Sequence, residues 1–291
     1  MRRSIEEARQ RYAEELRFTA KVGSRAVVEA FASVPRERFL GPGPWRVLSP
    51  MAMAEYWTTE DADPRHLYHD VLIAIDEERR INNGQPSLWA RMYDQLELSR
   101  GDHVVHIGAG TGYYSAILAE IVGRAGRVTA IEVDPTLAAR ATENLATAWP
   151  QATVVAADGF RFQPDHPADA IVINAGVTHF SAVWLDALAA ENGRLLVPLT
   201  NAERWGAFLM ITRQPGDPRR YAARFAGRVG IIPCVSGRDA AAEERLTAAL
   251  AKGDFTAIRS LRRAPEDPDH TCWLAGDGWW LSTAPAAEAP G

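Results

Sequence analysis

The sequence lacks the features that mark several classes of protein. It contains two cysteines, Cys234 and Cys272, which are too few for a disulfide framework and lack the spacing of metal ligands. The net charge of −5 argues against a general nucleic-acid-binding protein, because such proteins are usually basic. No apolar run reaches the ~18 residues that span a bilayer, and the charged N-terminus has no signal-peptide core. We therefore expect a cytoplasmic protein with reduced thiols that binds neither nucleic acid nor a membrane.

The most informative segment is a short strand pattern followed by three glycines at alternate positions. The β-branched run 103–107 comes first, and an apolar helical pattern follows at 115–122. Between them lie six loop residues: Gly108, Ala109, Gly110, Thr111, Gly112 and Tyr113. Glycines let the chain turn tightly and approach a ligand, and the next helix begins with free N–H groups.

The spacing of these glycines indicates which cofactor the loop binds. A dinucleotide fingerprint reads Gly-x-Gly-x-x-Gly, whereas the third glycine here comes one residue earlier. The form Gly-x-Gly-x-Gly after a strand is common in S-adenosylmethionine-dependent methyltransferases. The loop therefore predicts S-adenosyl-L-methionine as the cofactor, and a purely steric glycine turn is the alternative.

From residue 101 onward, short apolar runs alternate with helical patterns. Strands are expected at 103–107, 127–132, 153–157, 170–174 and 194–199, followed by a strand pair at 207–213 and 228–233. This alternation predicts an α/β fold with a doubly wound, mostly parallel sheet that ends in an antiparallel edge hairpin.

Three regions are expected along the chain. Residues 1–100 are expected to form an N-terminal helical cap, with helices at 4–19 and 25–33 and an irregular stretch at 45–66. Residues 101–235 are expected to form the cofactor-binding domain. Residues 236–291 are expected as a C-terminal extension, with helices at 240–252 and 255–263 and a tryptophan-rich hairpin at 272–282. These tryptophans are interpreted as packing residues, and a recognition surface is the alternative.

Polar residues follow three of the expected strands, at the sheet edge where such folds bind ligands. Glu132, with Val133 beside it, ends the second strand and is expected to accept hydrogen bonds from ribose hydroxyls, the alternative being a helix cap. Asp158-Gly159 follows the third strand and is expected to accept from an adenine amine, the alternative being a plain turn. Asn174 ends the fourth strand and completes the expected cofactor site.

Further segments resemble the protein-L-isoaspartate O-methyltransferase family over residues 22–235. The matching segments are Val34-Pro35-Arg36, Tyr68-His69-Asp70, Gln85-Pro86, 98–102, 107–113, Asp158-Gly159 and 193–198. The resemblance implies a Rossmann-like methyltransferase that acts on a carboxylate. The family's usual substrate is the α-carboxyl group of isoaspartate in damaged proteins.

The departures from the family pattern gather on the acceptor side. The family's loop before Gln-Pro reads Thr-Ile-Ser, and its serine hydroxyl lies at the reacting carboxylate. Here the segment reads Asn82, Asn83, Gly84 and Gln85, which we call the acceptor loop and expect to orient the methyl acceptor. A plain turn is the alternative. The tail after residue 236 also exceeds the family's usual length, and extended relatives in ribosomal-peptide biosynthesis methylate an aspartate side chain.

These features and the resemblance predict a carboxyl O-methyltransferase that acts on an aspartyl or isoaspartyl residue of a peptide or protein, and the tailoring of a ribosomal peptide is one role that the extended relatives suggest. A carboxylate with a pKa near 3.9 is ionised at pH 7, so no general base is required. A phenol acceptor would need one, and His179 is the candidate, whereas His106 is expected to be a core residue. A small-molecule O- or N-methyltransferase and a non-catalytic protein with the cofactor fold are the alternatives.

Overall fold

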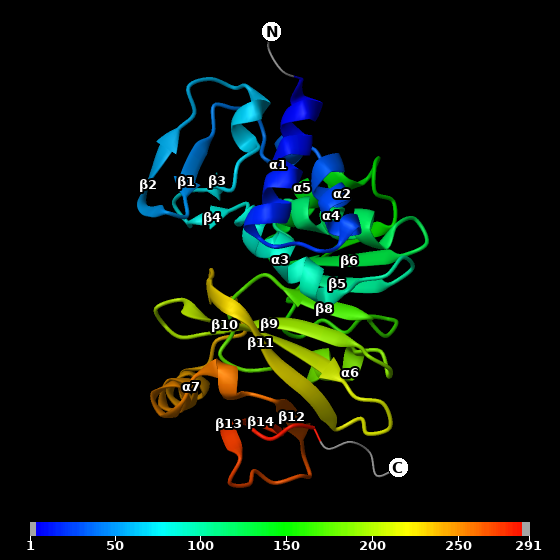
Figure 1. Ribbon diagram of the computed structural model, residues 1–291, viewed down its shortest axis with the longest axis vertical. Coiled ribbons are helices and arrows are strands. Elements are labelled where there is room, and N and C mark those ends of the chain that lie inside the picture. Colours follow the sequence, from blue (N-terminus) through cyan, green and yellow to red (C-terminus); the bar gives the residue numbers. More distant parts are fainter. Residues whose placement is uncertain (1–3, 287–291) are drawn as a thin grey trace. The chain divides into compact units, whose positions relative to one another are not determined.

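The computed structural model describes residues 4–286 and divides the chain into two compact units. The first unit comprises the residues up to 102 together with 109–156, and the second comprises 103–108 together with the residues from 157 onward. Each unit is described by itself below, and Figure 1 labels the elements of both.

The first unit is rich in helices. They are α1 (Ile5–Thr19), α2 (Arg25–Ser33), α3 (Pro86–Leu96), α4 (Tyr113–Val122) and α5 (Pro135–Leu145), with the short 3₁₀ helices η1 (Arg36–Phe39) and η2 (Pro64–Leu67). The expected helices at 4–19 and 25–33 are confirmed. Ser4 forms a capping box with Glu7, and Ser24 caps α2, which explains where both helices begin.

The first unit also contains a small antiparallel sheet, in the order β2-β1-β3-β4. Its strands are β1 (Arg46–Ser49), β2 (Ala52–Thr58), β3 (Leu72–Asp76) and β4 (Ile81–Asn82). The expectation of an irregular stretch at 45–66 was therefore wrong. Trp45 and Val47 bury their side chains with Leu67 and Ile73 in one apolar cluster, and this burial fixes the short strands.

Two further strands of the first unit pair in parallel, namely β6 (Arg127–Glu132) and β7 (Ala152–Ala156). Helices α4 and α5 both pack against these strands. Nearly all of α4 is buried, which matches its continuous apolar sequence. Asp134 caps α5 by accepting from the N–H groups of Thr136 and Leu137, and this keeps α5 starting directly after the end of β6.

The second unit is built on a sheet with the order β13-β14-β12-β11-β10-β9-β8-β5. The strands are β5 (His103–Ile107), β8 (Ala170–Ile173), β9 (Arg194–Thr200), β10 (Trp205–Arg213), β11 (Arg220–Gly230), β12 (Ser260–Arg263), β13 (Cys272–Gly276) and β14 (Trp279–Ser282). β5, β8 and β9 run parallel, and the remaining pairs are antiparallel. Its helices are α6 (Ala182–Ala187), α7 (Ala240–Lys252) and the short η3 (Phe255–Ala257).

The predicted α/β class with a parallel central part is confirmed, but the antiparallel part is longer than a hairpin. The strand expected at 228–233 is β11, which begins at Arg220. The helix expected at 255–263 was wrong, because Ser260–Arg263 forms β12 between β11 and β14. Without β12, the edge of β11 would leave backbone N–H and C=O groups unpaired. Pairing these groups stabilises the segment as a strand more than its local sequence pattern stabilises a helix.

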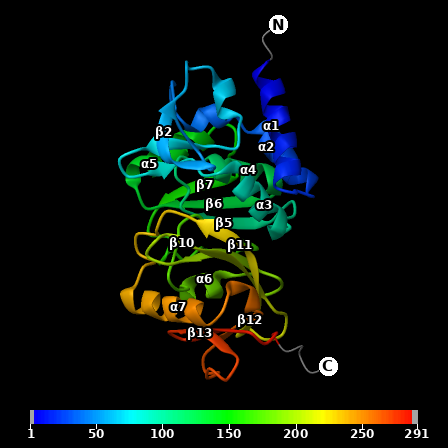
Figure 2. The same ribbon diagram turned by 60° about the vertical axis from the view of Figure 1, so that its left-hand side comes forward.

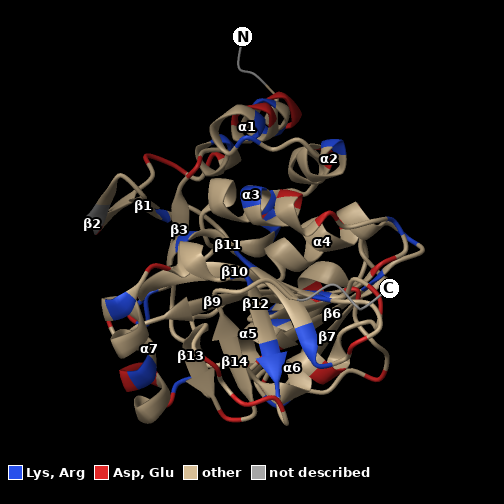
Figure 3. Ribbon diagram, turned by 60° about the horizontal axis from the view of Figure 1, so that its bottom comes forward, with Lys and Arg blue, Asp and Glu red and all other residues tan. Residues whose placement is uncertain are grey.

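The expected helix at 240–252 and the tryptophan-rich hairpin are both confirmed. α7 packs beside β13, as Figure 2 shows. α7 carries both acidic and basic residues along its length, as Figure 3 shows. Trp279 and Trp280 are buried, and Trp279 packs edge-on against Phe180 with 4.7 Å between ring centroids. Burial favours the packing interpretation of these two tryptophans.

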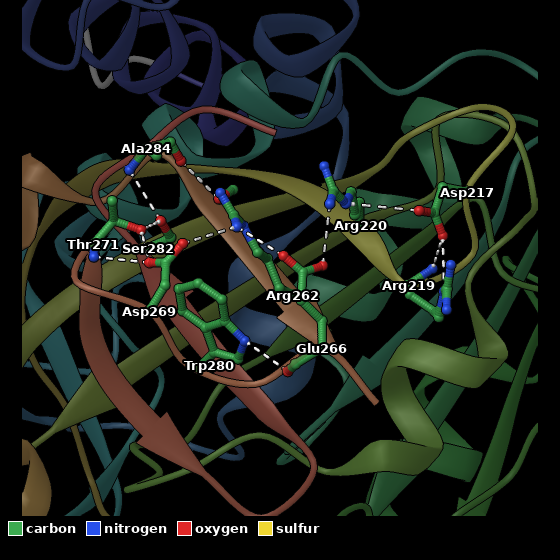
Figure 4. A network of polar contacts seen from close by, with 11 residues as sticks. Asp217, Arg219, Arg220, Arg262, Glu266, Asp269, Thr271, Trp280, Ser282 and Ala284 are labelled. Atoms are coloured by element: carbon green, nitrogen blue, oxygen red, sulfur yellow. Dashed lines mark hydrogen bonds and ion pairs between the residues drawn. The ribbon is translucent and has the colours of Figure 1, made fainter. Parts of the chain in front are cut away.

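A polar network joins β12 to its neighbours (Figure 4). The Arg262 guanidinium lies 4.7 Å from the centre of the Trp280 ring, and its Nη1 donates to Glu266 Oε1 at 2.7 Å. Glu266 also pairs with Arg220 of β11 at 3.3 Å. The extension is therefore bound to the sheet by ionic contacts as well as by strand pairing.

Two general properties complete the description. None of the helices in residues 4–286 has the length and apolarity needed to cross a membrane. Across the same residues, no cluster of three or more His, Cys, Asp or Glu side chains could hold a metal ion.

Candidate active site

The glycine loop turns tightly within the first unit. The Ala109 N–H donates to the Ile131 carbonyl at 3.1 Å, and the Gly112 N–H donates to the Ala109 carbonyl at 2.9 Å. Gly110 and Gly112 have φ values of 57° and 95°, a region that favours glycine. No atom lies within 4 Å of the position a Cβ would take at Gly110. The loop thus presents bare main chain before the start of α4, as a nucleoside-binding turn requires.

Glu132 lies at the end of β6, against this loop. Its Oε2 accepts from the Gly110 N–H at 2.7 Å, and its Oε1 accepts from the Asp134 N–H at 3.0 Å. The residue is 7 % exposed, and burial raises the pKa of its carboxyl group, while the main-chain hydrogen bonds oppose that rise. The remaining lone pairs of both oxygens can accept from ligand hydroxyls, which fits the expected ribose contact.

Three neighbouring residues complete the first unit's share of the expected cofactor site. Val133, directly after Glu132, is an exposed apolar side chain. Thr111 is buried, and its hydroxyl has no hydrogen-bond partner among residues 4–286. Tyr113 instead packs its ring against Phe39 in the core. A nucleoside has polar hydroxyls and a flat ring. The unpartnered Thr111 hydroxyl and the buried Glu132 carboxylate fit the polar groups, and the exposed Val133 side chain fits the ring.

The second unit holds Asp158 and Gly159 close to its first residue after the boundary at 156, and Asn174 directly after β8. Asp158 accepts from the Phe160 N–H at 3.0 Å and from the Ser236 hydroxyl. Gly159 has no room for a side chain, because a Cβ would lie 2.3 Å from Ile107. The Ser236 contact was not predicted, and no local sequence signal could have found it, since the two residues are 78 positions apart.

Two histidines of the second unit occupy different environments. His106 is buried in β5 as expected, and burial lowers its pKa to about 4, while the neighbouring Asn174 side chain opposes that shift. Asn174 therefore lies beside a neutral imidazole. His179 is partly buried, packs edge-on against Phe160 at 4.9 Å and contacts the Thr178 hydroxyl, and burial lowers its pKa as well.

The acceptor loop is held by a buried arginine of the first unit. Arg36 is fully buried, and its Nε donates to Asn83 Oδ1 at 3.0 Å. The other four N–H groups donate to main-chain carbonyls, those of Leu67, His69, Val71 and Gly84. A guanidinium has five N–H donors, so every one is used. This hub was missed by the sequence reasoning, although Arg36 belongs to the Val-Pro-Arg segment already noted.

The three amide side chains of the acceptor loop differ in what they offer to a ligand. Asn82 Oδ1 accepts from the Gly84 N–H at 3.1 Å, and its Nδ2 contacts the Tyr56 hydroxyl at 3.4 Å. Gln85 Nε2 donates to Asp70 Oδ2 at 3.0 Å. Asn83 is anchored through its oxygen to Arg36, and its Nδ2 makes no hydrogen bond within the described residues. The NH₂ group of Asn83 is thus the oriented donor of this loop.

Gly84 occupies a position that excludes a side chain. Its φ is 71°, and a Cβ there would lie 2.9 Å from Trp89 Nε1 and 3.0 Å from Tyr114 Cε2. Both neighbours are rings packed in the interior, with 5.6 Å between their centroids. The space that a serine side chain would need is therefore filled by two aromatic residues.

Comparisons with known proteins identify the family. The sequence model of the protein-L-isoaspartate(D-aspartate) O-methyltransferase family matches residues 7–237. The chain belongs to this family. A protein-L-isoaspartate O-methyltransferase of Gloeobacter violaceus is 32% identical over 209 residues, covering 70% of this chain and 90% of the relative. A protein-L-isoaspartate O-methyltransferase of Aeropyrum pernix is 35% identical over 196 residues, covering 66% of this chain and 67% of the relative.

Solved structures support the fold of this protein-L-isoaspartate O-methyltransferase family member. A structure titled protein-L-isoaspartate O-methyltransferase superposes with a TM-score of 0.63 at 24% identity, covering 77% of this chain and 66% of that one. The structure of a putative family member from Plasmodium falciparum, in complex with S-adenosyl-L-homocysteine, superposes with a TM-score of 0.58 at 15% identity. The match covers 78% of this chain and 97% of that one. At these identities the likeness concerns the fold alone.

Membership of the protein-L-isoaspartate O-methyltransferase family makes the chain an S-adenosyl-L-methionine-dependent methyltransferase. The glycine loop, Glu132 and the Thr111 hydroxyl fit this cofactor chemically, as shown above. Their roles as cofactor ligands, together with those of Val133, Asp158, Gly159 and Asn174, remain predictions. α7 and the strands β12–β14 follow residue 237 and lie outside the family match.

Proposed function

We propose that this methyltransferase esterifies a carboxylate of an aspartyl or isoaspartyl residue in a peptide or protein. The carrying observation is that the family match includes both the cofactor loop and the acceptor loop. The names of these relatives describe enzymes acting on protein L-isoaspartate, which supports the same acceptor class here. The acceptor loop offers amide groups and lacks an ionisable side chain, which suits an acceptor that is already charged.

The chemistry requires the chain to bind, orient and desolvate rather than to move protons. S-adenosyl-L-methionine supplies an activated methyl group on its sulfonium. Glu132 would accept from the ribose hydroxyls, and the bare glycine loop allows close approach of the nucleoside. The Asn83 NH₂ group would donate to one acceptor oxygen and leave the other free to attack. Positioning of this kind supplies most of the acceleration when the nucleophile needs no base.

Paired peptides test the acceptor. Peptides with isoaspartate, aspartate or asparagine at one position are incubated with the enzyme and S-adenosyl-L-methionine, and mass spectrometry reports the added methyl group. Methylation of an acidic peptide, with no methylation of the asparagine peptide, is the expected result. A rate that stays flat from about pH 6 to pH 9 supports a carboxylate, because its ionisation is complete there. A rate that rises through neutral pH contradicts it and favours a hydroxyl acceptor with His179 as base.

Variants of the acceptor loop test which amide carries the contact. Asn83→Leu is expected to lower kcat/KM for the peptide about 30-fold, because a carboxylate loses an oriented donor in a dry site. Asn82→Ala and Gln85→Ala are expected to cost less, because the amides of Asn82 and Gln85 are engaged with neighbouring side chains. Full kcat/KM in all three variants would show that the loop does not hold the acceptor.

We further propose that the natural acceptor is a biosynthetic peptide, a tailoring role in place of repair. Two departures from the family support this: Gly84 stands where the family has serine, and the chain continues beyond the family match at residue 237. Kinetics on isoaspartyl repair peptides and on peptides with ordinary aspartate distinguish the roles. Preference for isoaspartate across unrelated sequences would indicate repair. If the enzyme methylates a small molecule and no peptide, neither the tailoring role nor the repair role is correct.

A further inference from the structure

The acceptor loop contacts the helix that begins at the glycine loop. The Tyr114 hydroxyl, in the first turn of α4, donates to the Gly84 carbonyl at 3.2 Å. The same carbonyl accepts from Arg36 Nη2 at a longer distance of 3.4 Å. Tyr114 comes two residues after Gly112, which ends the glycine loop. One side chain therefore spans from the start of α4 to the middle of the acceptor loop.

Tyr114 is well placed to hold a fixed distance between these segments. It is 5 % exposed, and its ring is packed by Trp89, Tyr93 and Tyr113 with centroid separations of 5.6, 6.1 and 5.0 Å. Burial raises the pKa of its phenol well above the usual 10, so the hydroxyl keeps its proton and remains a donor. A ring fixed on three sides has no other rotamer available without repacking its neighbours.

We propose that Tyr114 is a positioning residue that sets the acceptor loop against the cofactor-binding turn for methyl transfer. Transfer from a sulfonium is an in-line displacement, in which the oxygen–carbon bond forms as the carbon–sulfur bond breaks. Its rate depends steeply on how the two reactants are aligned. Its hydroxyl is engaged with the Gly84 carbonyl, so Tyr114 acts through the main chain that carries Asn83 and Gln85. This inference rests on the proposed acceptor role of that loop.

The chain offers a matched control for this contact. Tyr93 belongs to the same aromatic cluster and is equally buried, but its hydroxyl has no partner among residues 4–286. Tyr114→Phe removes a hydroxyl that donates a hydrogen bond to the acceptor loop. Tyr93→Phe removes a hydroxyl that makes no hydrogen bond within the described residues. The two variants lose the same atom from the same core, so a general packing effect would appear in both.

Kinetics separate positioning from structural support. Tyr114→Phe is expected to lower kcat about tenfold, with Kd for S-adenosyl-L-methionine by calorimetry and KM for the peptide changed less than twofold. Tyr93→Phe is expected to match the wild type. Equal losses in both variants would overturn the inference, as would wild-type kcat in Tyr114→Phe. A parallel loss of cofactor affinity would also overturn it, because the residue would then act on the glycine loop.

Hydrogen exchange tests the contact without any acceptor. Mass spectrometry of the cofactor-loaded enzyme is expected to show that the amides of Asn83, Gly84 and Gln85 exchange several-fold faster in Tyr114→Phe than in the wild type or in Tyr93→Phe. Unchanged exchange would refute the positioning role even if the protein methylated an unforeseen substrate. Faster exchange with no activity on any acidic peptide would instead remove the proposed function and leave the contact established.

Discussion

Two buried arginines illustrate different ways of keeping a charge inside a protein. Arg36, in the first unit, satisfies its five N–H groups with four main-chain carbonyls and one side-chain amide. No carboxylate among residues 4–286 forms an ion pair with it. Arg262, in the second unit, pairs with the carboxylates of Glu266 and Asp269 and lies over the Trp280 ring (Figure 4).

The difference matters because the two arginines fix different kinds of structure. Arg36 binds carbonyls contributed by several turns of irregular chain, so it determines the course of the acceptor loop. Arg262 binds side chains between regular strands whose ladders already set their course. A guanidinium whose five N–H groups all donate to one stretch of irregular chain fixes the conformation of that chain. An ion-paired guanidinium adds stability to a sheet whose strands are already held by backbone hydrogen bonds.

Removing Arg36 is expected to have the largest effect. Arg36→Leu leaves buried carbonyls and the Asn83 amide without donors, and should lower the free energy of unfolding by about 4 kcal/mol. Activity should be lost even below the unfolding temperature, because the acceptor loop loses its support. Denaturant unfolding and methyl transfer at low temperature check this. A loss under ~1 kcal/mol would show that water replaces the guanidinium.

Restoring the family's serine beside this hub is the next largest change. Gly84→Ser places a Cβ against Trp89 and Tyr114 at φ 71°, and should cost about 3 kcal/mol. The cost of Gly84→Ser should be smaller in a Trp89→Leu background than in the wild type, since the main steric partner is smaller. Thermal unfolding of the wild type, the two single variants and the double variant measures this difference. A stable single variant would mean that the loop relaxes freely.

Removing Arg262 is expected to cost less than removing Arg36. Arg262→Leu should lower the free energy of unfolding by about 2 kcal/mol, because Glu266 keeps Arg220 as a partner and Asp269 is well exposed. Methyl transfer should be unchanged. Raising the salt concentration should narrow the gap between variant and wild type only slightly, since ion pairs that are partly buried are weakly screened. A loss equal to that of Arg36→Leu would erase the distinction between the two arginines.

Acid sensitivity of the fold is expected to come from His106, a buried group of the second unit. His106 has a folded pKa of about 4, below the unfolded value near 6.5, so the unfolded state binds more protons. Stability should therefore fall as pH drops from about 6.5 towards 4, by about 1.4 kcal/mol at pH 5.5. His106→Asn should flatten this fall, whereas replacing the exposed His166 should not. Urea unfolding at several pH values measures it.

The sequence predicted the elements with clear periodicity and the loop chemistry that is local. The helices at 5–19 and 25–33 begin at recognisable caps, and the glycine loop follows a β-branched strand. The errors share one physical cause, which is that distant partners decided the outcome. β12 became a strand because β11 offered an open edge, and β1 and β2 formed over a cluster completed by Ile73.

The contacts of the candidate site were the least predictable feature. Arg36 reaches Asn83 across 47 positions, and Ser236 reaches Asp158 across 78. Neither pair has a pattern in the sequence, because side-chain hydrogen bonds depend on tertiary placement rather than on spacing. The prediction that amides line the acceptor loop stands on residue types alone, and the structure adds which of them is already engaged.

The strand ladder of the second unit has a consequence for where the chain can be divided. The family match stops at residue 237, yet Arg220, Tyr221 and Ala222 of β11 pair with Arg262, Leu261 and Ser260 of β12. The end of the family match thus falls inside one hydrogen-bonded sheet and does not coincide with its edge. A protein cut at that limit would carry an uncovered strand, and its fate would be self-association rather than a smaller working enzyme.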